Sequence, residues 1–317
     1  MGDELNLEAI VPDEMAGQRV DKVLAQLFSD FSRARLQQWI RDGHVMVGGK
    51  QPRPRDKVLG GEQVELHTVL EAQGEWKAEP IPLDIVYEDE SLLVINKGAG
   101  LVVHPAVGNR DGTLLNALLH HAPELEAVPR AGIVHRLDKE TSGLLVIART
   151  LAAHKALTDM MQAREIQREY EAVVQGVMTA GSTIEAPIGR HPVQRTRMAV
   201  VNNGRPSVTH YRVSERFRAH SHIRVQLETG RTHQIRVHMA HIRYPLLGDP
   251  VYGGRLRIPS GCTEALEHQL RQFRRQALHA ARLRLSHPLS GEEMGWQAPL
   301  PEDMRILLEV LREDAAQ

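Results

Sequence analysis

The sequence predicts a mixed α+β protein of two domains. Its 317 residues, 42% hydrophobic and 25% charged, have an ordinary globular composition and a length typical of about two domains. Segments that alternate apolar and polar residues are frequent, and segments with helical spacing lie between them irregularly. No repeat with a period of about 20–50 residues is visible, so a repeat architecture is excluded.

The first predicted domain covers residues 10–72 and begins with two helices. In VDKVLAQLF, the first of them, apolar residues recur at helical spacing. Ser32 is suited to cap the following helix, RARLQQWIRDG, and Gly43 is suited to end it. The segments that start at His44 and at Gly60 have the composition of short strands with glycine turns.

A polar segment without a clear period separates the two domains. We place this linker at residues 73–80, where Gly74 and Pro80 interrupt regular structure. The larger domain then covers residues 81–317. It opens with two predicted strands on either side of an acidic turn at residues 88–90.

Strands are expected to dominate the larger domain. Helices are predicted from Thr113 and from Leu151, the latter with Thr150 as its N-cap, and a strand is predicted from Arg168. Polar and apolar residues alternate in the arginine-rich stretch beyond it, as in HIRVQLE from His222. That stretch is therefore expected to be mostly antiparallel β.

Basic residues are concentrated in two parts of a chain whose formal net charge is −1. Between Arg190 and Arg257 there are 13 arginines, three acids and no lysine, and between Arg19 and Lys57 there are nine Lys or Arg against four acids. Arginine is suited to planar, bidentate phosphate contacts, so these stretches predict two faces for a polyanion. For any single arginine, a solvated strand face is the better explanation.

Composition also excludes several classes of protein. The single cysteine, Cys262, rules out an internal disulfide framework and a multi-thiolate zinc site. No run approaches the ~18 apolar residues of a membrane span, and the acidic start of the chain is not a secretory signal. We therefore expect a cytoplasmic protein without a membrane partner, and a monomer because no long apolar seam is present.

The most informative segment is GIVHRLDKETSGLLVIART, from Gly132 to Thr150. It places a charged connection between two apolar runs, Ile133-Val134 and Leu144 to Ala148, which predict two buried strands. Loops held by rigid strands often present catalytic carboxylates. On composition alone, an ordinary solvated turn is the better interpretation.

The residues of this segment resemble a known signature. His135-Arg136-Leu137-Asp138, followed by Thr141-Ser142-Gly143, is similar to the motif of pseudouridine synthases of the ribosomal large subunit synthase A family. The resemblance covers nearly the whole chain and implies a largely antiparallel sheet with a central cleft. One departure is Gly98 after Lys97, where the family usually has proline, which adds backbone freedom at one turn.

The resemblance implies three catalytic residues. Asp138 matches the nucleophile, Arg236 the arginine that pairs with it, and Tyr170 the tyrosine that stacks on the target base. A buried aspartate needs a nearby cation to stay ionised. The alternation in GRTHQIRVH predicts a strand that presents Gln234, Arg236 and His238 on one face. Without the resemblance, an ordinary surface arginine would be preferred for Arg236, and a core tyrosine on a strand stays plausible for Tyr170.

RNA contacts are implied at two places. In the larger domain, Arg136 would open the RNA around the extruded base, and Arg231, His233 and Lys139 would contact RNA. The smaller domain resembles an S4 RNA-binding domain, for which a protein-docking module is the alternative. Its matching basic residues are Arg33, Arg35, Arg41 and Lys50.

The implied reaction converts uridine to pseudouridine in large-subunit ribosomal RNA, either free or in an assembling subunit, after the base is flipped out. It involves no redox change and no hydrolysis, so no cofactor is expected, and neither G-x-x-x-x-G-K-[ST] nor G-x-G-x-x-G occurs. A carboxylate suits covalent catalysis at a glycosidic bond. Attack at C1′, attack at C6 and a glycal route all stay open.

Two other functions are compatible with parts of the sequence. A metal-dependent RNA hydrolase would need ligands from His135, His233, His238 and His241, but their spacing is not H-E-x-x-H and no acidic partner has ligand spacing. We expect no metal site. A non-enzymatic RNA-binding or ribosome-assembly protein is disfavoured because the three residues implied in catalysis are all present.

Overall fold

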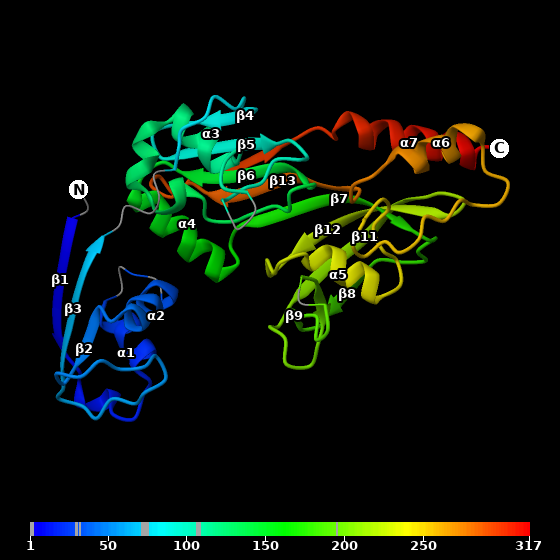
Figure 1. Cartoon of the computed structure of the whole chain (residues 1–317). Helices are drawn as coiled ribbons and strands as arrows, with labels where there is room; N and C mark the ends of the chain where they lie inside the picture. The colour runs from blue at the N-terminus through cyan, green and yellow to red at the C-terminus, as the bar shows by residue number, and fades with distance from the viewer. Residues whose placement is uncertain (1–2, 29–30, 32, 71–75, 106–108, 195) are drawn as a thin grey trace. The chain divides into compact units, whose positions relative to one another are not determined.

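The computed structural model describes residues 3–28, 31, 33–70, 76–105, 109–194 and 196–317. The chain divides into two compact units, residues 1–76 and residues 77–317. Each unit has its own hydrophobic core, and they are described separately (Figure 1). Within the described part of the chain, no helix combines the length and the apolar character needed to cross a membrane.

The smaller unit packs two helices on a three-stranded antiparallel sheet of order β1-β3-β2. Leu24, Leu36, Ile40 and Leu66 are buried in its core. Gly43 follows the second helix with φ of +84°, so the predicted helix end is confirmed, whereas Ser32 lies outside the described residues. Its elements are β1 (Asp3–Ile10), α1 (Val20–Leu27), α2 (Arg33–Asp42), β2 (Val45–Val47) and β3 (Gln63–Leu70), with a 3₁₀ turn at Asp13–Met15.

Strand β1 precedes the start that the sequence indicated for this domain at residue 10. Its register pairs Leu7 with Leu66 of β3, and Leu5, Leu7 and Ala9 pack against the core. The acidic residues alternate with these apolar ones. One face of β1 therefore packs against the core, while acidic residues such as Glu8 lie on the other face. These acids made the segment look too polar to be predicted as a strand.

The larger unit is built on a mixed sheet of nine strands. Their order is β4-β5-β6-β13-β7-β12-β11-β8, and β14 pairs with β13. Within this sheet only β6 and β13 are parallel among the described strands, so the predicted largely antiparallel sheet is confirmed. The strands are β4 (Ile85–Glu88), β5 (Leu92–Lys97), β6 (Ser142–Ala148), β7 (Gln167–Gln175), β8 (Ser182–Glu185), β11 (Val208–Arg216), β12 (His220–Leu227), β13 (Leu278–Ser286) and β14 (Glu293–Gln297), with β9 (Ile188–Arg190) and β10 (Met198–Val200) forming a separate pair.

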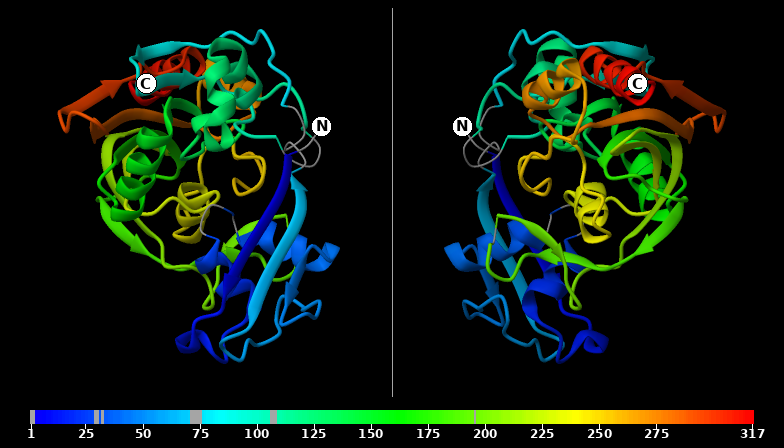
Figure 2. Two further views of the ribbon diagram at one scale, coloured as in Figure 1. Left: turned by 90° about the vertical axis from the view of Figure 1, so that its left-hand side faces the viewer. Right: turned by 90° about the vertical axis from the view of Figure 1, so that its right-hand side faces the viewer.

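Helices cover this sheet in two groups. The α4 helix begins after Thr150, whose Oγ accepts from the backbone N–H of Ala153 at 3.1 Å, and it packs on β5 and β6. Helices α6 and α7 lie side by side over another part of the sheet (Figure 2). The helices are α3 (Leu114–His121), α4 (Leu151–Ala163), α5 (Gln234–His241), α6 (Glu264–Gln272) and α7 (Glu302–Ala315), with 3₁₀ turns at Pro123–Ala127 and Pro129–Gly132.

The informative segment contains one strand instead of the two predicted. All seven residues of β6 are buried, which confirms the second apolar run. Ile133 makes only an isolated bridge to Ile147. The N–H of Val146 donates to Nε2 of His135 at 3.1 Å, so a side chain supplies an acceptor that a longer strand could have provided. The polar stretch that ends in Asp138 is consequently an irregular segment leading into β6.

Gly143 tests the close contact between β6 and β13. It has φ of +117°, and a Cβ at this position would lie 2.3 Å from the carbonyl oxygen of Ala280. We expect Gly143→Ala to lower the free energy of unfolding by more than about 2 kcal/mol, because backbone atoms must move. Urea denaturation would measure this. Gly98→Ala, where no atom lies within 4 Å, should change stability by less than about 0.5 kcal/mol, and an equal effect at both positions would contradict the explanation.

Candidate active site

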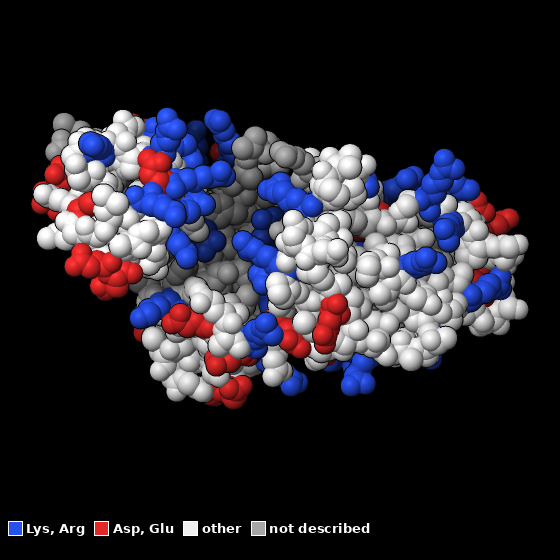
Figure 3. Space-filling model, turned by 90° about the horizontal axis from the view of Figure 1, so that it is seen from below, with Lys and Arg blue, Asp and Glu red and all other residues white. Residues whose placement is uncertain are grey.

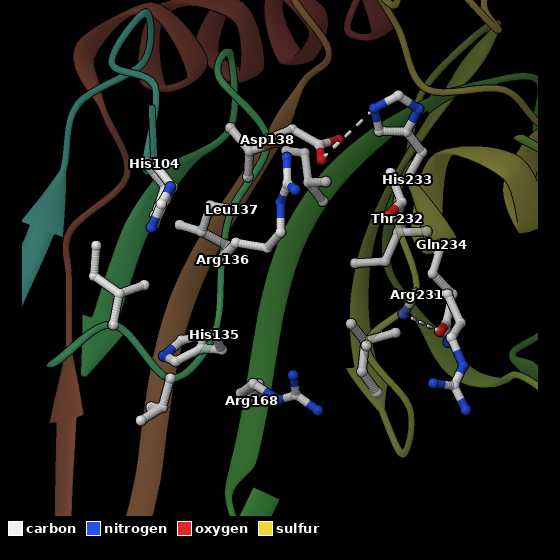
Figure 4. A pocket seen from close by; sticks show the side chains of 18 of the residues that line it. His104, His135, Arg136, Leu137, Asp138, Arg168, Arg231, Thr232, His233 and Gln234 are labelled. Carbon is white, nitrogen blue, oxygen red and sulfur yellow. Dashed lines mark hydrogen bonds and ion pairs between the residues drawn. The ribbon is translucent and has the colours of Figure 1, made fainter. Parts of the chain in front are cut away.

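A cavity of about 610 Å³ lies in the larger unit. Its wall includes residues 133–138 before β6, Tyr170 and Arg168 of β7, Leu278 of β13 and residues 230–236 around the start of α5 (Figure 4). Central strands of the sheet therefore form part of its wall. Asp138, Tyr170 and Arg236, which are far apart in the sequence, all line this one cavity.

Arg236 lies between two carboxylates. Its Nη1 donates to Asp138 Oδ2 at 2.9 Å, while its Nε and Nη2 donate to the two oxygens of Asp249 at 2.7 and 3.0 Å. Burial alone would lower the pKa of Arg236, but hydrogen bonds and charges from Asp249 and Asp138 raise it above its ordinary value. The guanidinium stays charged. Its Nε and Nη2 form a fork on Asp249, and its Nη1 holds Asp138 in the cavity wall.

Asp249 completes the arrangement from below the surface. Its side chain is fully buried, and its Oδ1 also accepts from the backbone N–H groups of Val251 and Tyr252 at 2.8 and 2.9 Å. Burial would raise the pKa of Asp249, but the hydrogen bonds from Arg236 and from these N–H groups lower it below its ordinary value. Arg236 is thus held by a partner that is ionised at pH 7 and does not line the cavity.

The segment that carries Arg236 is a helix, and the predicted strand is wrong. Residues Gln234–Met239 of α5 are all buried, so the polar residues that alternate along it do not mark a solvent-facing strand. Gln234 accepts from Thr229 and from the N–H of Arg231 and donates to the carbonyl of Val208. Each buried polar side chain of α5 has its own hydrogen-bond partners, so polar and apolar residues can alternate along a buried helix. This alternation resembles the pattern of a strand.

His233 faces Asp138 across the cavity, with Nε2 at 3.9 Å from Oδ1 (Figure 4). Its Nδ1 lies 2.9 Å from the hydroxyl of Tyr252, which accepts from the N–H of Met198 at 3.0 Å. Burial lowers the pKa of His233, so the ring is neutral at pH 7.

Lys97 anchors the loop that carries Asp138. This lysine is 2% exposed, and its Nζ donates to the carbonyls of Gly98, Leu101 and Lys139 at 2.7, 3.0 and 3.0 Å. Burial lowers its pKa to about 8. The carbonyl of Asp138 itself accepts from the N–H of Thr141 at 3.0 Å. The loop around Asp138 is therefore fixed through its backbone, and the glycine after Lys97 contributes one of the acceptors.

Tyr170 and Arg136 both line the cavity, but they differ in exposure to solvent. Tyr170 is 5% exposed on β7, and its pKa is raised by burial first and by the charge of Asp138, against a lowering effect of Arg168. Its phenol is therefore protonated at pH 7. Arg136 is exposed and lines the cavity near Asp138 (Figure 4).

The other predicted RNA contacts are dispersed. Arg231 and His233 line the cavity, whereas the side chain of Lys139 is exposed and does not line it. In the smaller unit Arg41 and Lys50 are exposed, and the side chains of Arg33 and Arg35 lie outside the described residues.

The histidines of the metal hypothesis do not gather at one site, and two of them show this. His238 is fully buried and bridges Thr209 Oγ and the carbonyl of Ala186, both at 2.9 Å, while His241 is exposed. Among the residues that the structure describes, no group of three or more His, Cys, Asp or Glu side chains could hold a metal ion.

Sequence reasoning missed Asp249 and Tyr252, which position Arg236 and His233. One signal was available, since Asp249 is one of only three acids among 13 arginines. An acid kept in so basic a stretch indicates a charge that something nearby requires. Tyr252 carried no comparable signal, because its ring lies 5.0 Å from the Arg236 guanidinium only as a result of the fold.

Comparisons with known proteins agree with this geometry. Residues 91–241 match the RNA pseudouridylate synthase family, and residues 18–64 match the S4 domain. The chain is 61% identical to "Ribosomal large subunit pseudouridine synthase D" of Pseudomonas aeruginosa over 314 residues, which cover 99% of this chain and 98% of that protein. The chain belongs to the RNA pseudouridine synthase family. This enzyme is therefore an isomerase that acts on RNA.

Further relatives of the synthase extend the comparison. A protein of the same name from Escherichia coli K12 is 57% identical over 315 residues, covering 99% of this chain and 97% of that protein. The solved structure of human RNA Pseudouridylate Synthase Domain Containing 4 has a TM-score of 0.57 at 27% identity, covering 72% of this chain and 92% of that one. Human RNA Pseudouridylate Synthase Domain Containing 1 has a TM-score of 0.54 at 25% identity, with coverages of 74% and 96%.

Asp249→Asn tests the buried pairing in this synthase. We expect the free energy of unfolding at pH 7 to fall by about 3–5 kcal/mol, because the variant breaks a buried ion pair. The folded-state pKa of Asp249 lies below its unfolded value, so its contribution is present above about pH 4 and is lost as the pH falls through the folded-state pKa. The gap between wild type and variant should therefore shrink below about pH 4.

Chemical denaturation between pH 7 and pH 2 would measure this gap. Asp159→Asn is the control because Asp159 is exposed on α4, and it should change stability by less than about 0.5 kcal/mol. A gap that stays constant down to pH 2 would contradict the role given to the charge of Asp249.

Proposed function

We propose that this synthase isomerises uridines of large-subunit ribosomal RNA, with Asp138 as the nucleophile. The observation that supports Asp138 is its carboxylate in the cavity wall, paired at 2.9 Å with an arginine that a second, buried aspartate holds in place. The printed name of the bacterial relatives supports the choice of RNA.

The reaction breaks the N1–C1′ bond of uridine, turns the base and joins C5 to C1′, so the product has the same atoms as the substrate. A nucleophile that holds the sugar or the base covalently between the two steps is sufficient. Arg236 holds the Asp138 side chain through a hydrogen bond at 2.9 Å, and the carboxylate is the form that attacks. Asp249 retains the arginine when the charge of Asp138 is consumed in the adduct, so the cation does not lose both of its partners.

The remaining groups of the cavity suit a flipped nucleotide. Tyr170 offers a protonated, largely buried aromatic side chain against which a uracil ring can stack. Arg136 is exposed beside the nucleophile and would occupy the space that the extruded base leaves in the RNA. Arg231 and His233 would contact the RNA strand, and Lys139 would do so outside the cavity.

The S4 unit would supply affinity for structured RNA. Figure 3 draws both units, and Lys and Arg side chains are spread over the face that it shows, with Asp and Glu among them. Arg33, Arg35, Arg41 and Lys50 are proposed to contact phosphates, and affinity should then fall steeply with salt. The substrate would be the free RNA or an assembling subunit, and the enzyme would act as a cytoplasmic monomer.

Asp138→Asn tests the nucleophile. We expect pseudouridine formation in large-subunit ribosomal RNA to fall by at least about a thousandfold, because an amide cannot form the covalent adduct. RNA binding should be nearly unchanged. Base-specific derivatisation followed by primer extension would locate the modified uridines, and filter binding would measure affinity.

Three outcomes separate the alternatives. Modification by wild type alone supports the assignment, and equal modification by both proteins would rule out Asp138 as nucleophile. Binding without modification by wild type, on both free RNA and subunits, would favour a non-enzymatic RNA-binding protein. Glu90→Gln, in the acidic turn after β4, is a matched acid-to-amide control that should leave modification unchanged.

Arg41→Gln combined with Lys50→Gln tests the smaller unit. Each lost phosphate contact should lower the dependence of log K on log salt by about one, without changing which uridines are modified. Filter binding over a salt series would measure the slope. Lys155→Gln, an exposed position on α4, should leave the slope unchanged, and an unaltered slope in the double variant would contradict RNA contact by these two residues.

A further inference from the structure

A second cavity adjoins the first in the larger unit. It has a volume of about 390 Å³ and is lined by residues around β7, β11, β12 and β13. Arg168 and Leu227 line both cavities, so these side chains form a part of the wall that the two cavities share. The charged side chains around the second cavity are mostly basic: Arg164, Arg168, Arg282 and Arg284, with Glu169 and Glu228.

Every described carboxylate that lines either cavity is already paired with a cation other than Arg168. The three pairs join Asp138 to Arg236 at 2.9 Å, Glu169 to Arg282 at 2.5 Å and Glu228 to Arg164 at 2.9 Å. No carboxylate of these walls is therefore left to neutralise a further guanidinium.

Arg168 is a buried cation without a partner. Arg168 is only 8% exposed, and its Nε is shielded from solvent. No hydrogen bond or ion pair joins its side chain to any described residue. The pKa of His135 is lowered to about 3, by burial first and by the charge of Arg168 second. The His135 ring is therefore neutral at pH 7 and supplies no negative charge to Arg168. An unpaired buried charge is unfavourable, which indicates a site completed by an anion.

The space around this guanidinium is kept open by a glycine. A Cβ on Gly230 would lie 3.0 Å from Nη1 of Arg168. Arg168 is two residues before Tyr170 on β7, so both side chains extend from the same face of the strand. Figure 4 shows Arg168 within the cavity wall, separate from the pair formed by Asp138 and His233.

We propose that Arg168 binds a backbone phosphate of the RNA, next to the flipped uridine, at the point where the strand passes from the first cavity into the second. This rests on the proposed function. A phosphate supplies the missing negative charge, it matches the two terminal nitrogens of a guanidinium, and RNA carries one at every nucleotide. Arg284, exposed in the second cavity, is placed for a neighbouring phosphate.

The test combines one protein change with one change in the RNA. The RNA is a stem-loop of large-subunit ribosomal RNA, prepared unmodified and with single neutral methylphosphonate linkages at successive positions around one uridine. We expect Arg168→Gln to raise KM on unmodified RNA by about ten- to a hundredfold, with a smaller change in kcat. One methylphosphonate linkage should raise KM for wild type by a similar factor and have little further effect on the variant.

Several results would overturn the proposal. An unchanged KM for Arg168→Gln would do so, as would effects of protein and linkage that multiply at every position. Absence of pseudouridine with wild type would instead contradict the proposed function. Arg168→Lys should recover part of the affinity, because it keeps the charge but loses the fork. Arg305→Gln, an exposed position on α7, is the control and should leave KM unchanged.

A purely structural role for Arg168 predicts a different result. If the arginine stabilised the fold, Arg168→Gln would lower the melting temperature. If its charge serves RNA, removing it relieves an unpaired buried cation, and the melting temperature of the free enzyme should stay the same or rise by a few degrees. A clear loss of stability together with an unchanged KM would assign Arg168 to the fold.

Discussion

The active site depends on one cation placed between two acids. Arg236 donates to Asp138 at the cavity wall and to Asp249 behind it, and this order divides the work between the two carboxylates. The outer one is free to react, while the inner one is tied to the arginine and to two backbone N–H groups. In the proposed reaction, a single Arg–Asp pair would leave the arginine without a partner once the nucleophile has reacted, whereas this triad keeps it paired.

The fold brings the members of this triad together from separate parts of the chain. Asp138 lies in the irregular segment before β6, Arg236 on α5 and Asp249 in the loop after that helix. Each is fixed by local contacts of its own, Lys97 for the first segment and Gln234 for the start of α5. The geometry is therefore set by several independent supports, so a small shift in one need not displace the others.

The sequence predicted an element correctly where its apolar residues mark one buried face, and it failed where polar side chains are buried and hydrogen-bonded inside the protein. The S4-like unit, the larger α+β unit with its largely antiparallel sheet, the helices α1 to α4 and several strands were predicted, because their apolar spacing reflects one buried face. No element was predicted where α6, α7, β13 and β14 lie. Prediction failed at α5, where buried polar side chains alternate for reasons of pairing and imitate a strand. It failed again at β1, where acids alternate with core residues. The positions of Asp249 and Tyr252 depend on tertiary contacts that no local pattern records.

The parallel pairing of β6 with β13 has a consequence for biosynthesis. Strand β13 lies between β6 and β7, which follow each other in the sequence, and Ser142 of β6 contacts His279 of β13 across 137 residues of chain. The segments that carry Asp138 and Tyr170 are thus separated by a strand that is synthesised after both of them. Loop closure over such a distance is slow and comes late. The nascent chain consequently cannot complete the sheet between these two segments until β13 has been translated, and a chain cut before β13 would lack the strand that joins them.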